Sequence, residues 1–278
     1  MTPDLPRLIP SRDGTPIAVF ASGEGPPLLL LHGTAGDHTT FRVMGPRLED
    51  TFTVNAMDRR GRGASGDRLP YAIDREFEDV AVVAEQLASE SGGPIAVFGH
   101  SYGGRCALGA ALWTGSISRV ICYEGAPTPP GQTYHPPDLE AHLHDRLEAG
   151  DPDGLLATFM TEVVGMPPAD LASYRADPVW PVRVAAAGTI PRELEAERTP
   201  AASLDVLGRV QQPVLQVLGS ASLPVFRAAT LALDSRLSDG RMVEIEGARH
   251  AAHHTHPDAM VTAVRAFLAD DHQDGMPD

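Results

Sequence analysis

The chain has 278 residues, of which 42% are hydrophobic and 21% are charged, a composition typical of a globular protein with a substantial core. Its formal net charge at pH 7 is −15, and its 22 basic residues are all arginines that form no cluster. A partner with many negative charges, such as nucleic acid or an anionic membrane, is therefore not expected.

The first residues, Met-Thr-Pro-Asp-Leu-Pro-Arg, lack the basic segment followed by an apolar stretch that is typical of a secretory signal. No apolar run approaches membrane-spanning length. We therefore expect a cytoplasmic protein. Cys106 and Cys122 fall in predicted buried elements, so we expect neither a disulfide nor a metal site at the cysteines.

Short apolar runs alternate with amphipathic segments along most of the chain. The runs predict strands at residues 17–21, 27–31, 52–57, 94–98, 120–123, 214–218 and 242–245. Helical patterns lie between most of them, notably at residues 76–89, 105–113 and 257–268. The alternation predicts an α/β fold with a mostly parallel, doubly wound sheet, whose first two strands form an antiparallel hairpin.

The alternation stops in the middle of the chain. Residues 138–149, 153–164 and 178–187 read as helices with no strand between them. The Pro-Pro-Gly sequence at 129–131 marks where the chain leaves the sheet, and Thr199-Pro200 marks its return. We predict a core made of residues 1–127 and 204–278, with a helical insertion at 128–203.

The sequence Gly99-His100-Ser101-Tyr102-Gly103 joins a predicted strand to a predicted helix. Such a turn lifts the serine hydroxyl clear of the sheet, because glycines two residues on either side avoid collisions with the strand and the helix. The helix would also direct its free N–H groups toward an oxyanion beside the serine. We predict that Ser101 is a nucleophile rather than part of an ordinary glycine-rich turn.

Residues 28–36, Leu-Leu-Leu-Leu-His-Gly-Thr-Ala-Gly, read as a buried strand that runs into a loop at the carboxyl edge of the sheet, where ligands bind in open α/β sheets. A tetrahedral acyl intermediate needs two fixed donors. We predict that these are the backbone N–H groups of Thr34 and Tyr102, with Gly33 beside the substrate; an ordinary strand-to-helix turn is the alternative. Residues 58–66 are rich in Arg and Gly but lack the P-loop pattern, so we assign them a structural role.

Four histidines, at positions 250, 253, 254 and 256, lie between the last predicted strand and the last predicted helix. A loop histidine just beyond a parallel strand can reach the elbow and accept the proton of Ser101, so His250 is the predicted base. His253, His254 and His256 crowd the same segment and raise the alternative of a metal site. Because no zinc-binding His-Glu-x-x-His helix is present, we expect no metal and no organic cofactor.

Together these motifs resemble the α/β-hydrolase superfamily: His32-Gly33, the run from Asp58 to Ser65, the Gly-x-Ser-x-Gly elbow, and the loop that ends at His250. The resemblance covers residues 15–268 and keeps the family order of serine, acid and histidine. It implies an α/β-hydrolase fold with a helical cap at residues 128–203. A serine at the elbow, where dehalogenases and epoxide hydrolases of this fold have aspartate, implies acyl transfer to water.

One departure from the family concerns the acid. The family commonly has it in a Gly-x-x-Asp sequence after the strand at 214–218, where this chain has Ser222, and serine cannot stabilise an imidazolium as a carboxylate does. Some branches of the fold place the acid after the preceding strand, where this chain has Glu124. We therefore predict Glu124 as the acid, with Asp234 and Glu246 as weaker candidates.

The relocated acid is also similar to that of zearalenone lactonases, which have a Ser, Glu, His triad. The sequences Pro-Val-Trp at 178–180 and Thr-Ile-Pro at 189–191 resemble part of their cap. This weaker resemblance implies a lactone substrate against which Trp180 packs. A place for Trp180 in the core of the cap is the alternative.

We therefore expect a cofactor-independent serine hydrolase that cleaves an apolar carboxylic ester or lactone and uses Ser101, His250 and Glu124. The same residues would suit cleavage of a carbon–carbon bond or a thioester. A third alternative is a ligand receptor without catalysis on this fold, for which Ser222 in place of the usual acid is the only support.

Overall fold

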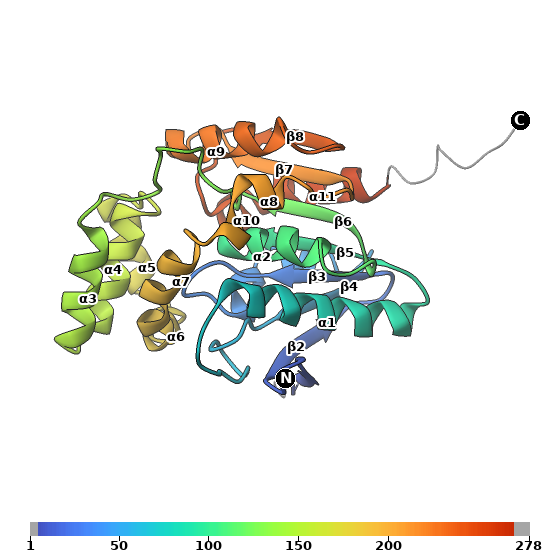
Figure 1. Ribbon diagram of the computed structural model, residues 1–278, viewed down its shortest axis with the longest axis horizontal. Helices are drawn as coiled ribbons and strands as arrows, with labels where there is room; N and C mark the ends of the chain where they lie inside the picture. The colour runs from blue at the N-terminus through green and yellow to red at the C-terminus, as the bar shows by residue number, and fades with distance from the viewer. Residues whose placement is uncertain (1–4, 270–278) are drawn as a thin grey trace, which may run out of the picture.

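The computed structural model describes residues 5–269, so the outermost parts of the predicted core, residues 1–4 and 270–278, lie outside the described residues. Its centre is an eight-stranded sheet with the strand order β1-β2-β4-β3-β5-β6-β7-β8 (Figure 1). All neighbours from β4 to β8 are parallel, which confirms the predicted mostly parallel α/β fold. The strands are β1 (Arg7–Pro10), β2 (Pro16–Ser22), β3 (Pro27–Leu31), β4 (Thr53–Met57), β5 (Ile95–His100), β6 (Ile117–Tyr123), β7 (Val214–Gly219) and β8 (Gly240–Ile245).

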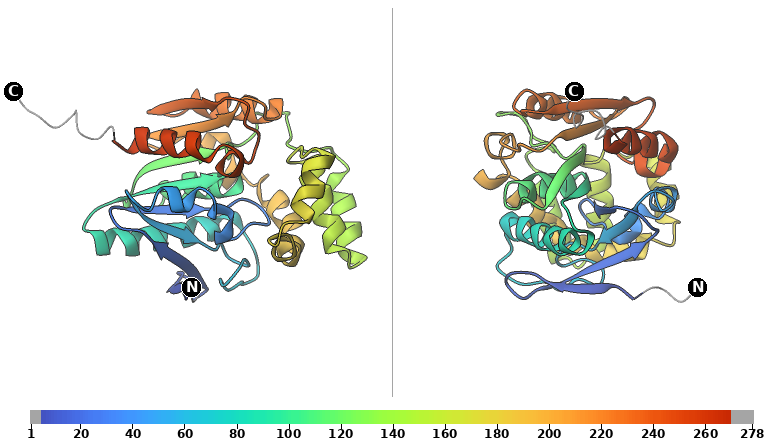
Figure 2. Two further views of the ribbon diagram at one scale, coloured as in Figure 1. Left: turned by 180° about the vertical axis from the view of Figure 1, so that it is seen from behind. Right: turned by 90° about the vertical axis from the view of Figure 1, so that its right-hand side faces the viewer.

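Helices cover both faces of the sheet, as the continuous apolar runs of its strands require. In β3, Leu29 and Leu31 contact one hydrophobic layer, whereas Leu28 and Leu30 contact the other. The first layer contains α1 (Ile73–Ser91), α2 (Tyr102–Ala111), α8 (Leu204–Leu207) and α9 (Pro224–Asp234), with the short 3-10 helix η4 (Pro200–Ala202). The second contains α10 (Ala252–Thr255), α11 (Pro257–Ala269) and the 3-10 helices η1 (His38–Phe41) and η2 (Gly45–Arg47), seen from behind in Figure 2.

The predicted hairpin between residues 17–21 and 27–31 is wrong. β2 pairs antiparallel with β1 and with β4, whereas β3 lies between β4 and β5 and is parallel to both. β1 has four residues, of which Ile9 alone is buried, so its sequence carries too little periodicity to predict a strand. The sheet therefore has a short antiparallel edge beside its parallel centre.

The segment between β6 and β7 contains helices and no strand, as predicted. It includes two helices that the sequence did not reveal, α5 and α7. The helices are α3 (Leu139–Glu148), α4 (Pro152–Glu162), α5 (Pro168–Arg175), α6 (Trp180–Ala186), η3 (Ala187–Thr189) and α7 (Ile190–Ala196). We call these the inserted helices; they pack around a hydrophobic cluster of their own and gather beside one end of the sheet (Figure 1).

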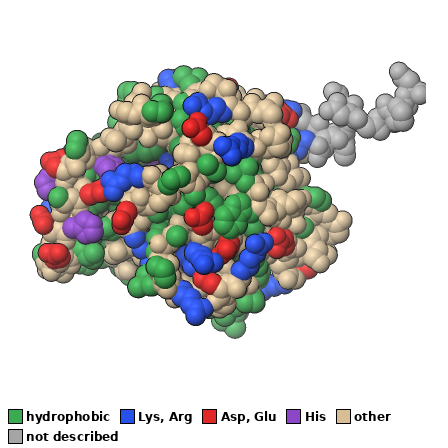
Figure 3. All heavy atoms as spheres, viewed as in Figure 1, with side chains coloured by type: hydrophobic (Ala, Val, Ile, Leu, Met, Phe, Trp, Pro, Cys, Tyr) green, Lys and Arg blue, Asp and Glu red, His purple; other side chains and the backbone are tan. Residues whose placement is uncertain are grey.

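The surface carries charges of both signs. On the face drawn in Figure 3, arginine and acidic side chains are interspersed and no large basic patch is visible. Of the helices between residues 5 and 269, none combines the length and the hydropathy needed to cross a membrane.

Candidate active site

The turn between β5 and α2 holds Ser101 in a strained backbone conformation, with φ 54° and ψ −125°. Few residues other than glycine adopt a positive φ, and such strain is common where a side chain must be presented at a functional site. A Cβ on Gly99 would lie 2.3 Å from the carbonyl oxygen of Gly103, and a Cβ on Gly103 would lie 2.4 Å from that of Leu31. The two glycines thus allow the close packing that places Ser101 at the carboxyl end of β5.

His250 and Glu124 form a buried pair next to this turn. The Nδ1 of His250 lies 2.5 Å from Oε2 of Glu124, although the residues are 126 positions apart in the chain. Their side chains are 7% and 0% exposed, respectively, so water does not compete for the bond. The bond orients the imidazole and leaves its Nε2 free for another partner.

The second carboxylate oxygen of Glu124 is held from the neighbouring strand. Its Oε1 accepts a 2.8 Å hydrogen bond from the Gly219 backbone N–H and a 2.6 Å bond from the Ser222 hydroxyl. The weaker acid candidates lie elsewhere: Asp234 accepts a hydrogen bond from Gln216, and Glu246 is exposed. Among the three carboxylates considered from the sequence, Glu124 is the one in contact with His250.

The two residues expected to supply oxyanion donors lie on either side of Ser101. Thr34 follows β3 in the loop after His32-Gly33, and Tyr102 is the first residue of α2. The Tyr102 ring is buried, and its hydroxyl lies 2.9 Å from that of Tyr71. The structure brings the predicted set together, because one small recess is lined by Thr34, Ser101, Tyr102, Glu124 and His250.

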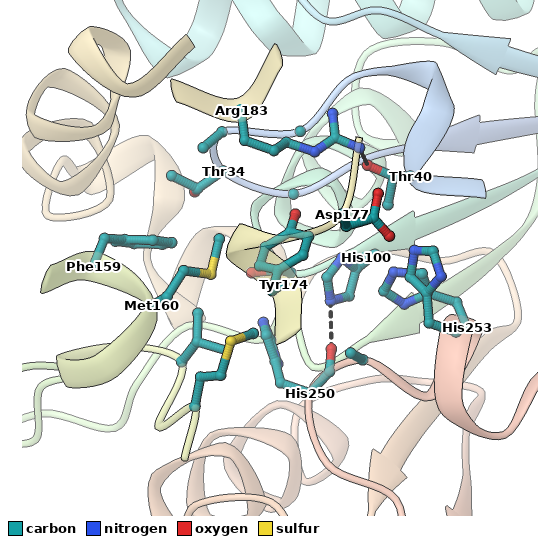
Figure 4. A pocket seen from close by; sticks show the side chains of 18 of the residues that line it. Thr34, Thr40, His100, Phe159, Met160, Tyr174, Asp177, Arg183, His250 and His253 are labelled. Carbon is teal, nitrogen blue, oxygen red and sulfur yellow. Dashed lines mark hydrogen bonds between the residues drawn. The ribbon is translucent and has the colours of Figure 1, made fainter. Parts of the chain in front are cut away.

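A larger cavity of about 350 Å³ opens over Ser101 and His250 (Figure 4). Gly33 is among the residues that line it, and its contact with substrate stays a prediction. One wall is apolar and comes from α4 and the loop between α4 and α5, with Phe159, Met160, Val164 and Met166. The opposite wall is polar and contains Thr40, Arg42, Asp177, Arg183, His253 and His254.

The charged groups of the polar wall are paired within the protein. Arg183 donates to Asp37 at 2.5 Å and to the Thr39 hydroxyl at 2.9 Å. Arg42 donates to Asp177 at 2.9 Å, which links the core to the inserted helices at the mouth of the cavity. The cavity therefore offers hydrogen-bonding groups without a large unpaired charge.

The other histidines near the cavity, His100, His253 and His254, differ in their contacts. His100 is bonded through Nε2 to the carbonyl oxygen of His250 at 2.8 Å, and its ring centroid lies 4.4 Å from that of His253 (Figure 4). Burial lowers the pKa of His100 and His253 well below the usual value, and burial beside Arg42 and Arg183 lowers the pKa of His254 to about 4. Within residues 5–269, no group of three or more His, Cys, Asp and Glu side chains is arranged to hold a metal ion.

Of the two places considered for Trp180, the structure shows the one in the core of the inserted helices. Trp180 is 5% exposed, packs in the cluster of the inserted helices and donates from Nε1 to Asp153 at 2.7 Å. It is not among the residues that line the cavity; its ring neighbour Tyr174 is. Sequence reasoning did not single out Tyr174 or Met160, because α5 was not predicted and a methionine in a helix carries no distinctive signal.

Comparison with known proteins gives matches over nearly the whole chain. A protein described as 2-(acetamidomethylene)succinate hydrolase from Mesorhizobium japonicum is 29% identical over 262 residues, which is 90% of each chain. A pimeloyl-[acyl-carrier protein] methyl ester esterase from Neisseria meningitidis is 27% identical, over 86% of this chain and 91% of that protein. The crystal structure of an alpha/beta hydrolase from Sphaerobacter thermophilus is 33% identical, with a TM-score of 0.80 over 94% of this chain and 100% of that one.

These relatives carry names other than zearalenone lactonase, so the similarity to those lactonases stays a prediction. The sequence model of the alpha/beta hydrolase family matches residues 28–263, which include the elbow, Glu124 and His250. The predicted superfamily is thereby confirmed, and the chain belongs to the alpha/beta hydrolase family.

Proposed function

We propose that this protein is a serine hydrolase that cleaves a carboxylic ester or lactone through an acyl-enzyme on Ser101. The observation that carries the proposal is the buried 2.5 Å contact between His250 and Glu124 beside the strained turn of Ser101. Ser101 as nucleophile, His250 as base and Glu124 as the acid that orients the base would form a Ser-His-acid triad. The name of the methyl ester esterase from Neisseria meningitidis, a relative across most of this chain, favours an ester.

The proposed reaction has two steps. In the first, Ser101 Oγ forms a bond to the acyl carbon, its proton moves to Nε2 of His250, and that proton then passes to the leaving alkoxide as the carbon–oxygen bond breaks. In the second, His250 takes a proton from water, the hydroxide attacks the acyl-enzyme, and Ser101 leaves with the proton of His250. Glu124 stabilises the imidazolium that forms in each step.

The N–H groups of Thr34 and Tyr102 are the proposed donors to the oxyanion. Donors fixed before the reaction stabilise the developing charge without reorganising, which is a large term in acyl transfer. The proposed set of groups is chemically complete without a metal or an organic cofactor.

We further propose that residues 128–203 form a cap over a core of residues 1–127 and 204–278. The cavity supports this division, because its apolar wall comes from the inserted helices and its reactive floor from the core. Its volume of about 350 Å³ suits a small molecule whose acyl or alcohol part is apolar. Nucleic acid and membranes are not proposed as partners.

The test is labelling by a fluorophosphonate together with a substrate panel. The probe should label wild type at Ser101 and leave the Ser101→Ala variant unlabelled. Among p-nitrophenyl esters of increasing chain length, aliphatic lactones, a thioester and a β-diketone, esters or lactones should be turned over fastest. Faster cleavage of the diketone or thioester would move the assignment to those reactions, and absence of both labelling and turnover would favour a receptor.

A further inference from the structure

Arg59, in the loop after β4, is buried among acceptors from three parts of the chain. Its Nε donates to the carbonyl oxygen of His32 at 2.9 Å, and its Nη2 to that of Gly33 at 3.2 Å. Its Nη1 donates to Glu76 of α1 at 2.8 Å, and Nη2 also donates to Glu193 of α7 at 2.7 Å. The guanidinium is 0% exposed, so these contacts replace its hydration entirely.

The contact between Arg59 and the Gly33 carbonyl affects the orientation of the Thr34 N–H, which is a proposed oxyanion donor. The carbonyl of Gly33 and the N–H of Thr34 belong to one planar peptide unit and point in opposite directions, so fixing the one fixes the other. His32 Nε2 accepts from the Arg59 backbone N–H at 3.0 Å, which places the ring proton on Nδ1, and Nδ1 then donates to the Gly33 oxygen at 2.8 Å. The Gly36 backbone N–H also donates to this oxygen at 3.1 Å, so three donors, one of them the Arg59 side chain, hold the peptide plane. Bonds to its carbonyl also polarise its N–H.

Arg59 also contacts the residue of the second proposed donor. Its guanidinium carbon lies 4.8 Å from the centre of the Tyr102 ring, within the range of a cation–π contact. A single side chain thus contacts the Gly33 carbonyl, in the peptide unit that carries the Thr34 N–H, and the ring of Tyr102.

Glu193 anchors Arg59 from the inserted helices. Its Oε1 accepts from Arg59 and, at 2.6 Å, from Nη2 of Arg62, and its carboxylate is 0% exposed. Burial by itself raises the pKa of Glu193, but Arg59 and Arg62 outweigh burial and hold that pKa below its usual value, so the group is a carboxylate. A buried charge that loses its partner is strongly unfavourable, and Arg59 would shift toward its remaining acceptors if this carboxylate were neutral.

We propose that Glu193 and Arg59 are positioning residues: Glu193 holds the guanidinium of Arg59, and Arg59 fixes the direction of the Thr34 N–H in the oxyanion hole. The inserted helices thereby set part of the geometry of the reactive centre, in addition to forming a wall of the cavity. The inference rests on the proposed function, because it assigns Thr34 its role as a donor.

Glu193→Gln tests the inference, because it keeps the shape of the side chain and removes its charge. We expect kcat for the best p-nitrophenyl ester to fall by about tenfold to hundredfold, since a displaced catalytic group is costly, with KM within about twofold of wild type. Affinity for a trifluoromethyl ketone, whose adduct with Ser101 places an oxyanion in the hole, should fall by the same factor as kcat/KM. Affinity for the matching ether, which has no carbonyl group and cannot form an adduct with Ser101, should not change.

Asp79→Asn is the matched control. Asp79 of α1 accepts from Nε and Nη2 of Arg60, both at 2.7 Å, in an equally buried ion pair that involves the residue next to Arg59. Arg60 otherwise contacts Asp13 and the Arg75 carbonyl rather than Gly33. The control should lower the melting temperature in a similar way and leave kcat within about twofold.

Arg59→Lys is the second variant, for the case in which Glu193→Gln does not fold. Lysine keeps the buried positive charge, but one ammonium cannot reach both carbonyls and both carboxylates. It should show the same loss of kcat at unchanged KM. The inference is overturned if folded variants keep kcat within about twofold of wild type, or if Asp79→Asn loses as much; either result leaves the serine mechanism intact, which the Ser101→Ala variant tests separately.

Discussion

The hydroxyl of Ser222 donates a 2.6 Å hydrogen bond to the carboxylate of Glu124, although the two residues are 98 positions apart and follow different strands. β6 and β7 are adjacent and parallel, so the chain segments after them meet at the same edge of the sheet. An acid placed after β6 can therefore reach the same histidine as an acid placed after β7. Ser222, at the position where the family commonly has its acid, here donates to Glu124, the proposed acid, which follows the neighbouring strand.

Glu124→Gln is expected to lower kcat by a thousandfold or more, on the order of the loss seen when a triad acid is made neutral. The amide cannot stabilise the imidazolium, but it has the shape of the carboxylate, so we expect little change in melting temperature. Steady-state kinetics and thermal melts of the purified variant measure both. Full activity of a folded Glu124→Gln protein would remove the carboxylate from the mechanism.

Ser222→Ala is the companion variant. It removes one hydrogen bond to Glu124 and leaves the Gly219 N–H and His250 bonds in place. We expect kcat to fall by less than about tenfold, because the remaining bonds still orient the carboxylate. A loss equal to that of Glu124→Gln would mean that Ser222 takes part directly in the reaction.

Ser101→Ala is expected to abolish hydrolysis, with a loss of at least about a thousandfold, and to leave the fold intact. The hydroxyl faces the cavity and contributes little to packing, whereas the backbone of the turn is set by its glycines. Turnover measured beside circular dichroism separates the two effects. Retention of most activity in a folded variant would end the assignment of Ser101 as nucleophile.

Trp180→Phe should change the stability of the protein, whereas Met160→Ala should change its substrate preference. The first removes the bond from Trp180 Nε1 to Asp153 inside the inserted helices and should cost about 1 kcal/mol of unfolding free energy with KM unchanged. The second enlarges the cavity beside Ser101 and should shift the preferred ester toward longer acyl or alkyl chains. Thermal melts and activity on esters of increasing chain length test the two variants. A change of chain-length preference in Trp180→Phe alone would indicate that Trp180 contacts the substrate.

The histidines around the cavity should make the folded state sensitive to acid. The pKa of His254 is about 4 in the folded protein against about 6.5 when unfolded, and that of His253 is also lowered by burial. The unfolded chain therefore binds more protons as pH falls, so stability is lost from about pH 6.5 toward pH 4. As pH falls through this range, the melting temperature of wild type should fall further than that of His254→Gln, because the variant lacks this titrating group.

Activity should survive exhaustive treatment with a chelator, because the proposed groups need no metal. The assay compares turnover before and after EDTA and gel filtration. Loss of activity that zinc restores would indicate a metal site at His253 and His254.

The sequence by itself determined those features that depend on short stretches of chain. The elbow at Ser101, the loop before His250 and the alternation of strands with helices follow from local periodicity and turn chemistry, and the fold they predict is confirmed. Glu124 could be chosen as the acid because residues 219–222 contain no carboxylate and because the resemblance to branches of the family with the acid after the preceding strand points to the residue that ends that strand. The structure places it against His250, and its role in catalysis stays a prediction.

Tertiary structure alone decided which distant side chains meet. β2 lies beside β4 rather than β3 because sheet order depends on the packing of the whole core, and the sequence pattern of a strand does not name its neighbour. For the same reason Trp180 turns into the inserted helices, Ser222 reaches Glu124, and Glu193 reaches Arg59 across 134 residues. Periodicity predicts that a residue is buried, whereas the partners of that residue depend on how separate elements pack together.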